Sequence, residues 1–357
     1  MLRRAMVGVD IGSVSVKVVE LSVGSGGGFR LEKCASELLP RGAVAEGNVV
    51  SIEPVAQAIR QALGKAGIRE SRAVLALPAT LTENQTISLP DNLSDDEMVM
   101  QVESEANRLF PPSQNVNFDF VVIGPSETEG GIGVNVTAAA SDHVQTRVTA
   151  AEMAGLKPLV MDVEEFALQR TVTHMLALRT DIDEAQARDL PVVAVFCLGG
   201  SRSWVAFYQG WKELYRQPVG IWGDQLTEAV SQTFTLEFLQ AEVKKRKNSL
   251  PDAYREQLLR PALEHVAAEV ANAIRNFMSV SSVGRVDEII LGGGHASLVG
   301  LQAAVQQQMQ LPTTLANPFV NMETAEKVNA RYLQRDLPAY IVAAGLALRG
   351  LQQGAAA

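Results

Sequence analysis

The sequence has few cysteines and no excess of basic residues. Cys34 and Cys197 are the only cysteines among 357 residues, which excludes a disulfide framework and indicates a reducing compartment. The 31 Lys and Arg residues stand against 40 Asp and Glu, so the formal net charge is -9. Proteins that follow the phosphates of nucleic acid usually have the opposite sign of charge. We therefore expect a cytoplasmic protein that has no nucleic-acid partner.

Long hydrophobic runs are also missing from the sequence. The longest are LPVVAVFCLGG, near residue 195, and AYIVAAGLAL, near residue 343. Both reach about half of the roughly 20 residues that span a bilayer. The N-terminal MLRRAMVGVD lacks the apolar core and the small-residue cleavage site of a secretory signal. We expect no export, and we expect membrane association only through a partner or a surface helix.

Enough apolar residues are present for more than one core. With 47% hydrophobic and 20% charged residues, a chain of this length exceeds one ordinary domain, so we expect at least two lobes. Apolar strands at 6–11, 14–22 and 29–38 precede a helix at 53–66 and the strand RAVLALP. This order predicts a mixed sheet with a crossover helix.

Residues 80–160 have a different pattern, typical of a small α+β insert carried by the first lobe. A helix there begins after the N-cap residue Ser94 and has acids in its first turn. After the insert, a strand and a helix close the first lobe, and RTDIDEAQARDL is the predicted linker. The elements predicted in the insert are TENQTISLP, LSDDEMVMQVESEANRLF, NVNFDFVVIG, IGVNVTAAA and DHVQTRVTAAEMAG.

The stretch MVGVDIGSVSVKVVEL predicts a buried hairpin with a carboxylate, a glycine and hydroxyls at its tip. Glycine turns leave backbone N–H groups open to an anion, so Gly12 and Ser13 fit a phosphate. Asp10 fits the carboxylate that holds Mg²⁺ beside phosphate oxygens, and Lys17 can return an ammonium to the same phosphates. A plainer interpretation stays open, in which Asp10 and Ser13 only satisfy turn amides and Lys17 is a solvated edge residue.

The same pattern occurs again in PVVAVFCLGGSRSWVAFYQ, where Gly199, Gly200 and Ser201 form the turn. Two facing turns of this kind can clamp a polyphosphate between two lobes. A third glycine turn, EIILGGGHASLVGL, follows a buried strand and precedes a helix, where a flat ring or a phosphate can approach the backbone. Alone it is a common strand-to-helix turn, but three glycine turns in this order favour a nucleotide site.

The order of five segments resembles that of the actin-like ATPases. VGVDIGSVSVKVVEL, DVEEFALQR, FCLGGSRS, LGGGHASLVGL and AYIVAAGLALRG are similar to the phosphate-1, connect-1, phosphate-2, adenosine and connect-2 motifs of that superfamily. Within it, the insert helix and AAEMAGLKPLVMDVE resemble the PilM family, the FtsA-like cytoplasmic proteins of type IV pilus assembly. The resemblance covers nearly the whole chain.

The resemblance implies an α/β actin-like ATPase fold of two duplicated lobes with a nucleotide cleft between them. A small FtsA-like α+β subdomain is inserted in the first lobe. The implied boundaries are 1–82 for the first-lobe core, completed by about 158–180 and 336–357, then 83–157 for the insert, 186–235 and 280–335 for the second-lobe core, and 236–279 for a helical subdomain.

The resemblance also implies that ATP and Mg²⁺ bind in the cleft. Asp10 is the residue that organises Mg²⁺ through water. The phosphates and the adenosine contact glycines and polar residues of the three turns, which are Gly12, Ser13, Lys17, Gly199, Gly200 and Ser201 for the phosphates and Gly292, Gly293 and Gly294 for the adenosine.

Four further residues match the family's motifs, each with a plainer alternative. AEVKK resembles an Ala-Glu-x-x-Lys helix, which places Glu242 and Lys245 beside the base and ribose. An ordinary solvated helix pair is the alternative. In DVEEF, Asp162 and Glu164 match the position of a water-orienting or metal-facing carboxylate, and acids at a helix N-terminus are the alternative.

Two features depart from the pattern of the relatives. The phosphate-2 turn of relatives usually begins with an aspartate, whereas this position is Cys197, and a neutral thiol is a poor Mg²⁺ ligand. We therefore expect ATP binding with slow or absent hydrolysis. FtsA-type relatives end in an amphipathic anchor, whereas this chain ends LRGLQQGAAA, so we expect the membrane to be reached only through a partner.

The implied function is a cytoplasmic ATP-binding adaptor of the type IV pilus inner-membrane platform. The implied partner is the N-terminal cytoplasmic peptide of a PilN-like membrane protein, bound between the first-lobe core and the insert. Other pilus motor or regulatory proteins are further candidates. Two alternatives stay open. One is a small-molecule kinase, which needs a base carboxylate near the γ-phosphate, and the other is a filament-forming scaffold.

Overall fold

The structure is a computed structural model of the chain. It describes residues 6–24, 26–126, 130–177, 190–210, 212–328 and 330–353. The linker predicted at RTDIDEAQARDL therefore lies, except for Leu190, outside the described residues.

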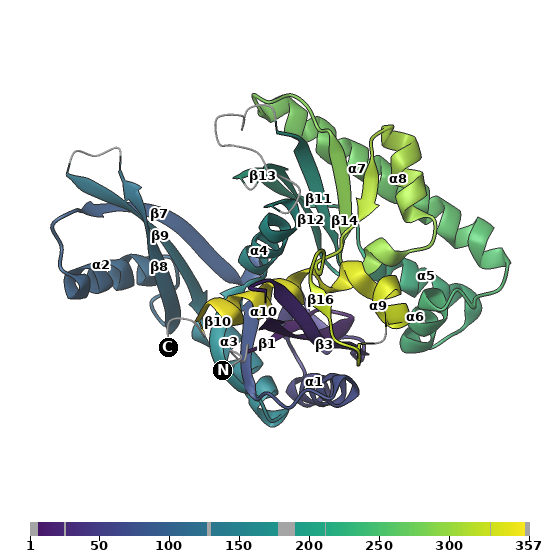
Figure 1. The fold of residues 1–357 in the computed structure, drawn as a ribbon, viewed down its shortest axis with the longest axis horizontal. Coiled ribbons are helices and arrows are strands. Elements are labelled where there is room, and N and C mark those ends of the chain that lie inside the picture. Colours follow the sequence, from purple (N-terminus) through teal and green to yellow (C-terminus); the bar gives the residue numbers. More distant parts are fainter. Residues whose placement is uncertain are drawn as a thin grey trace.

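The first lobe is built on a six-stranded sheet with the strand order β10-β6-β1-β2-β3-β16 (Figure 1). The strands β1, β2 and β3 form an antiparallel meander, whereas β6 and β10 run parallel to β1. The bounds are β1 (Val7–Ile11), β2 (Ser15–Val23), β3 (Phe29–Leu38), β6 (Arg72–Leu77), β10 (Lys157–Val163) and β16 (Glu323–Thr324).

The second lobe repeats this topology in a five-stranded sheet with the order β13-β12-β11-β14-β15. Its first three strands again form an antiparallel meander, and β14 and β15 continue parallel to β11. The predicted duplication of the hairpin is therefore a duplication of the whole sheet. The bounds are β11 (Val192–Leu198), β12 (Ser203–Gln209), β13 (Lys212–Val219), β14 (Glu288–Gly292) and β15 (Thr313–Leu315).

The helices α4 (Glu164–Ala177) and α10 (Ile341–Gln353) lie between the two sheets (Figure 1). One apolar cluster joins Val74 of β6, Leu168 of α4, Leu346 of α10 and Val195 of β11. Burial of this continuous apolar surface stabilises the contact between the lobes.

Two glycines of this middle layer permit close approach of backbones. A Cβ atom on Gly345 of α10 would lie 1.8 Å from the carbonyl oxygen of Ala167 in α4. A Cβ atom on Gly8 of β1 would lie 2.3 Å from the carbonyl oxygen of Ala343. Only glycine allows the helices and the strand to pack this closely.

Four helices cover the outer faces of the sheets. On the first sheet, α1 (Ile52–Ala66) and α3 (Ser141–Met153) pack against alternate residues of β1 such as Val7 and Val9. On the second, α7 (Arg260–Val280) and α8 (Leu301–Met309) pack against alternate residues of β11 such as Phe196. Because strand side chains alternate, Asp10 and Cys197 project from the opposite faces, toward the space between the lobes.

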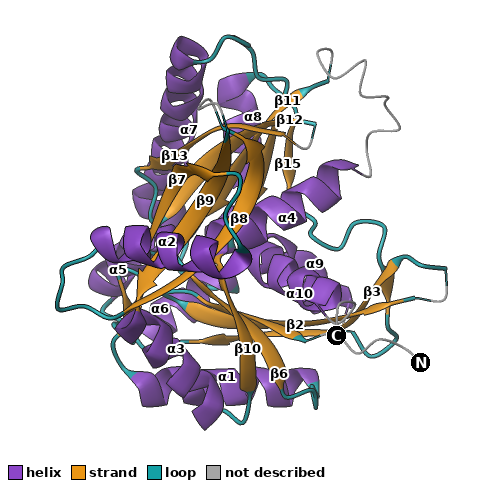
Figure 2. Ribbon diagram, turned by 90° about the vertical axis from the view of Figure 1, so that its left-hand side faces the viewer, coloured by secondary structure: helices purple, strands orange, loops and turns teal. Residues whose placement is uncertain are grey.

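The insert is a three-stranded sheet in the order β7-β9-β8, covered by α2 (Asp95–Arg108) (Figure 2). The predicted N-cap is confirmed: the Ser94 hydroxyl accepts a hydrogen bond from the Glu97 N–H, and the Glu97 carboxylate accepts one from the Ser94 N–H at 2.9 Å. The bounds are β7 (Thr82–Pro90), β8 (Val116–Pro125) and β9 (Gly131–Ala140).

The packing of α3 differs from its predicted place in the insert. Ala150 and Ala151 of α3 belong to the same apolar cluster as Val55 and Ile59 of α1, beneath the six-stranded sheet. The helix also contacts β8 and β9, so α3 lies at the junction of the insert and the first-lobe core. The subdomain boundaries 83–157 and 236–279 stay predictions.

The remaining elements complete the second lobe and the edges of the sheets. Among the described residues, none of the helices is both long and apolar enough to cross a membrane. The strands and α-helices not predicted from the sequence are β4 (Val44–Ala45), β5 (Asn48–Val49), β13, β15, β16 and α9 (Ala330–Asp336). The helices expected between about 223 and 279 are α5 (Gly223–Phe234), α6 (Phe238–Arg246) and α7.

Candidate functional site

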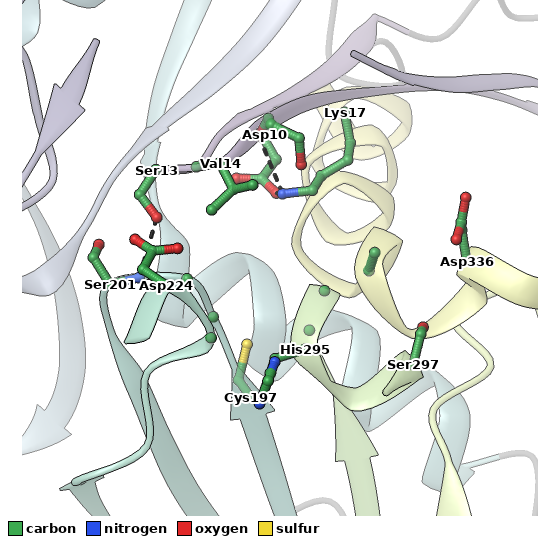
Figure 3. Close-up of a pocket in the computed structure, with 18 of the residues that line it drawn as sticks. Asp10, Ser13, Val14, Lys17, Cys197, Ser201, Asp224, His295, Ser297 and Asp336 are labelled. Carbon is green, nitrogen blue, oxygen red and sulfur yellow. Dashed lines mark hydrogen bonds and ion pairs between the residues drawn. The ribbon is translucent and has the colours of Figure 1, made fainter. Parts of the chain in front are cut away.

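A cleft between the lobes is lined by both predicted hairpin turns (Figure 3). It encloses about 1310 Å³, including space open to solvent. The cleft is concave and is lined by both polar and apolar side chains, as small-molecule sites usually are. Its walls also include the start of α5, the helix α6, and the turn that follows β14.

The first turn places a buried carboxylate beside an ammonium. Asp10 and Lys17 are register partners in β1 and β2, and the Lys17 Nζ lies 3.0 Å from the Asp10 Oδ2. Lys17 also donates to the Ser15 carbonyl oxygen at 3.3 Å. The turn is closed by the Gly12 N–H, which donates to the same carbonyl at 3.2 Å. Both charged groups line the cleft, so a phosphate there would meet a cation that is already held in place.

The second turn touches the first across the cleft. The Ser201 N–H donates a hydrogen bond to the Ser13 hydroxyl oxygen at 3.1 Å. At Gly200, a Cβ atom would lie 2.6 Å from the Ser13 Oγ and 2.5 Å from a Val14 methyl carbon, so only glycine fits. The Gly199 N–H donates to the Ser203 hydroxyl at 3.0 Å. The two turns predicted to face each other are thus in direct contact.

Cys197 is the structural counterpart of Asp10. Cys197 and Trp204 form the second-to-last register pair before the turn, as Asp10 and Lys17 do in the first hairpin. The second hairpin therefore has a thiol and an indole where the first has an ion pair. Burial raises the pKa of Cys197 to about 12, and the carboxylates of Glu164 and Asp10 add to the shift. The thiol is neutral at pH 7.

Glu164 lines the cleft, whereas Asp162 does not. Glu164 is the first residue of α4, and its Oε2 lies 3.2 Å from the Arg202 Nη2 of the second turn. Burial raises the pKa of Glu164, and Arg202 opposes that shift. Asp162 instead receives a hydrogen bond from Arg170 at 3.0 Å and another from the Val163 N–H. The geometry gives no support to a catalytic role for Asp162.

On the predicted adenosine side, Glu242 and Lys245 form a buried ion pair of 2.6 Å. Glu242 also accepts from the Thr227 hydroxyl at 2.7 Å and pairs with Arg246 at 2.6 Å. Burial alone would raise the pKa of Glu242, but Lys245 and Arg246 lower it to about 2. Both predicted residues line the cleft, so they are not an ordinary solvated pair.

The triple glycine divides between the cleft and the sheet. Gly293 and Gly294 line the cleft. Gly292 is the last residue of β14 and the register partner of Cys197 in the sheet. Gly293 has a φ of 87°, and a Cβ atom there would lie 2.4 Å from the Leu198 carbonyl oxygen. At Gly294 a Cβ atom would meet nothing within 4 Å, so this side is open to a ligand.

The sequence analysis missed further residues of the cleft, among them one histidine, one tryptophan and one aspartate. His295 follows the triple glycine and is buried, and burial lowers its pKa to about 4 with help from Lys245. Trp204 lies under the Arg216 guanidinium, whose carbon is 4.8 Å from the ring centroid. Asp224 is the second residue of α5. The signal available for Asp224 was an acid beside a glycine at the start of a predicted helix.

The family model of the type IV pilus assembly protein PilM matches residues 8–351. The chain belongs to the PilM family. A solved structure of a PilM–PilN type IV pilus biogenesis complex is 29% identical, covers 98% of this chain and 99% of its own, and has a TM-score of 0.76. The ethanolamine utilization protein EutJ from Carboxydothermus hydrogenoformans is 16% identical, covers 96% and 89%, and has a TM-score of 0.54, which shows a shared fold. The predicted actin-like fold and PilM family are confirmed.

Proposed function

We propose that this PilM-family protein is an ATP-binding adaptor of the type IV pilus inner-membrane platform, with slow or absent hydrolysis. The contact of the two hairpin turns supports this proposal most directly. One turn presents the Asp10–Lys17 pair at 3.0 Å, and the other presents the glycine backbone of 199–200. Backbone donors on one side and a charge pair on the other suit a polyphosphate with a divalent cation.

The residues of the cleft suit both the nucleotide and Mg²⁺. Lys17 offers an ammonium to phosphate oxygens, and Asp10 offers a carboxylate to Mg²⁺, which neutralises phosphate charge when bound. The open side at Gly294 and the polar side chains of Glu242 and Lys245 suit the base and ribose. The Asp224 Oδ1 is buried and has no hydrogen-bond partner, and a bound cation would satisfy it.

Slow hydrolysis follows from the groups around the cleft. Glu164 is our candidate for the carboxylate that orients a water, and its ion pair with Arg202 at 3.2 Å restrains it. Cys197 occupies the position in the second hairpin that Asp10 occupies in the first, and its neutral thiol is not a base. A positioned acid or base group contributes about 10²- to 10⁴-fold to a rate, so its absence suits a protein that binds ATP for long periods.

The partner is inferred from the relative solved as a PilM–PilN complex. We place the cytoplasmic N-terminal segment of a PilN-like inner-membrane protein between the first-lobe core and the insert. Contact with the membrane would then come through that partner. Other pilus motor or regulatory proteins are further candidates for the remaining surface.

Thermal unfolding with ATP, ADP and a panel of sugars, each with Mg²⁺, tests the proposal. A ligand at a hundredfold excess over its dissociation constant stabilises the fold by about 2.7 kcal/mol. We expect this stabilisation from ATP or ADP and none from sugars. A stabilising sugar would favour the small-molecule kinase, and no stabilisation by ATP at millimolar concentration would contradict the proposal.

A further inference from the structure

Asp224 is fixed to the second turn by the backbone. The Asp224 N–H donates to the Gly200 carbonyl oxygen at 3.1 Å, and the neighbouring Gly223 N–H donates to the Gly199 carbonyl oxygen at 3.0 Å. The start of α5 is therefore held against the turn that faces the first lobe. The position of the Asp224 side chain is set by the same elements that set the phosphate site.

The Asp224 carboxylate points toward the first turn (Figure 3). A Cβ atom built on Gly200 would lie 2.6 Å from the Asp224 Oδ1 and 2.6 Å from the Ser13 Oγ, so both oxygens approach one point. That point lies where the two turns meet. A carboxylate and a hydroxyl from different lobes thus converge beside the proposed phosphate site.

Five carboxylates line the cleft, and four of them have a cation within ion-pair distance. Among the described residues, the ion pairs leave Asp224 as the cleft carboxylate with no such partner, and its Oδ1 is buried without a hydrogen bond. The four pairs are Asp10 with Lys17, Glu164 with Arg202, Glu242 with Lys245 and Arg246, and Asp336 with Arg335.

An unpaired carboxylate beside a phosphate site is unfavourable unless a cation lies between the two anions. Mg²⁺ is usually held by one or two carboxylates together with phosphate oxygens. The first lobe supplies one carboxylate through Asp10. The second lobe has Cys197 at the equivalent strand position, so it must supply any second carboxylate from elsewhere.

We propose that Asp224 supplies the second lobe's carboxylate to the divalent cation of a bound nucleotide, directly or through a cation-bound water. This proposal rests on the proposed nucleotide binding. It explains how the cleft keeps a carboxylate on each side of the phosphates although the second hairpin has none. Asp224 is then a positioning residue for the cation, and its loss affects the cation more than the nucleotide.

The test measures Mn²⁺ binding to the full chain in the presence of AMP-PNP. The electron paramagnetic resonance signal of free Mn²⁺ reports how much of the cation stays unbound. The Asp224→Asn variant keeps the shape of the side chain and removes its charge, and Glu237→Gln is the matched control at an exposed position of the same lobe. We expect Asp224→Asn to weaken Mn²⁺ binding by about 10- to 100-fold, as loss of a metal-orienting group commonly does. The control should stay within twofold of the wild type.

Calorimetry of AMP-PNP in EDTA gives the second readout. Without a divalent cation, Asp224→Asn should bind the nucleotide as well as the wild type or better, because a negative charge near the phosphates is gone. Mn²⁺ affinity within twofold of the wild type would overturn the inference, and so would a parallel loss of nucleotide affinity in EDTA. If the Asn variant does not fold, Asp224→Ser, which suits a helix start, takes its place with the same expectations.

The two failures are distinguishable. If the wild type binds no AMP-PNP with or without a divalent cation, the proposed nucleotide binding is wrong and this inference falls with it. If the wild type binds Mn²⁺ and AMP-PNP together while Asp224→Asn binds both equally well, only the role of Asp224 is wrong.

Discussion

The hydroxyl oxygen of Ser13 accepts a hydrogen bond from the backbone N–H of Ser201 at 3.1 Å, and this bond joins the two lobes at the lining of the cleft. Each residue belongs to one of the two duplicated hairpin turns. A polyphosphate that enters between the turns competes for the same donor. Nucleotide binding and the relative position of the lobes are therefore coupled at this contact.

The first prediction concerns Cys197. Cys197→Asp places a carboxylate opposite Asp10, so the Mg²⁺-dependent ATPase rate should rise by about 10-fold or more, up to the roughly 10²- to 10⁴-fold that a positioned acid or base contributes. The wild-type rate should be far below the median enzyme rate of about 10 per second. Phosphate release measured with excess ATP gives both rates.

Cys197→Ser is the control, because it is neutral and of similar size. Without Mg²⁺ the Asp variant should be less stable than the wild type, since a third carboxylate then lies near Asp10 and Glu164. A folded Asp variant that binds Mg²⁺-ATP with no gain in rate would remove Cys197 as the cause of slow hydrolysis.

The second prediction is a pH dependence of stability caused by Glu165. Burial raises the pKa of Glu165 to about 7, and the neighbouring Glu164 adds to the shift. Because the folded-state pKa is above the unfolded value, the stabilisation is complete below about pH 4.3 and is lost as the pH rises through 7. At pH 8 the free energy of unfolding of Glu165→Gln should therefore be higher than that of the wild type, by up to about 3 kcal/mol.

Urea unfolding at pH 4 and pH 8 measures the difference. The gain should vanish at pH 4, where both side chains are neutral, and Gln can still accept the hydrogen bond from the Ala79 N–H. Glu53→Gln, at an exposed position in the first turn of α1, should show no gain at either pH. An equal gain at both pH values would contradict the assigned cause.

The third prediction concerns Arg41 of the first lobe, which contacts α5 and α6 of the second lobe. Its guanidinium lies 2.7 Å from the Glu228 carboxylate and 5.3 Å from the Phe238 ring centroid. The Arg41 side chain is exposed and its partners are half-buried, so the two contacts contribute roughly 0.5–1 kcal/mol together. Arg41→Ala should release a fluorescent ATP analogue about two- to fivefold faster in stopped-flow experiments.

High salt should reduce the difference between Arg41→Ala and the wild type, because screening weakens an exposed ion pair. Arg69→Ala, at an exposed position of the first lobe outside the cleft lining, is the control. Equal release from Arg41→Ala and the wild type at low salt would show that Arg41 does not restrain the nucleotide.

The local parts of the site were predictable from the sequence because they depend on neighbours in the chain. The hairpin around Asp10 and Lys17 follows from two apolar strands and a glycine turn, and the capping box of Ser94 follows from a serine three residues before a glutamate. Both signals are contained within a few residues.

The remaining parts depend on packing between distant segments. Asp162 and Glu164 stand two residues apart, and only the strand-to-helix junction decides that one contacts Arg170 while the other faces Arg202. Asp224 enters the cleft because α5 is bonded to the second turn. No periodic pattern in the sequence indicates such contacts between distant segments.

The fourth prediction concerns the membrane. The purified protein should sediment with vesicles that display a lipid-linked peptide of the cytoplasmic N-terminal segment of a PilN-like protein from the same organism. A scrambled peptide of the same composition and bare anionic vesicles should leave it in the supernatant. Sedimentation with bare vesicles would contradict recruitment through the partner, and failure to sediment with the peptide would contradict the assigned partner.

The fifth prediction is that Asp10 and Lys17 act as a unit in nucleotide binding. Asp10→Ala should weaken Mg²⁺-ATP binding and leave Lys17 as an unpaired ammonium beside the phosphates, so ATP binding in EDTA should weaken less. Glu20→Gln, on the same strand as Lys17 but paired with Lys33 at 2.9 Å, is the matched control. An Asp10→Ala variant with wild-type affinity would remove Asp10 from the site.

Calorimetric titration of the wild-type protein with ATP and Mg²⁺ tests the central claim most directly. We expect saturable binding at one site per chain, retained by Glu20→Gln and weakened by Asp10→Ala. No heat of binding and no thermal stabilisation at millimolar Mg²⁺-ATP would contradict a nucleotide site between the two turns.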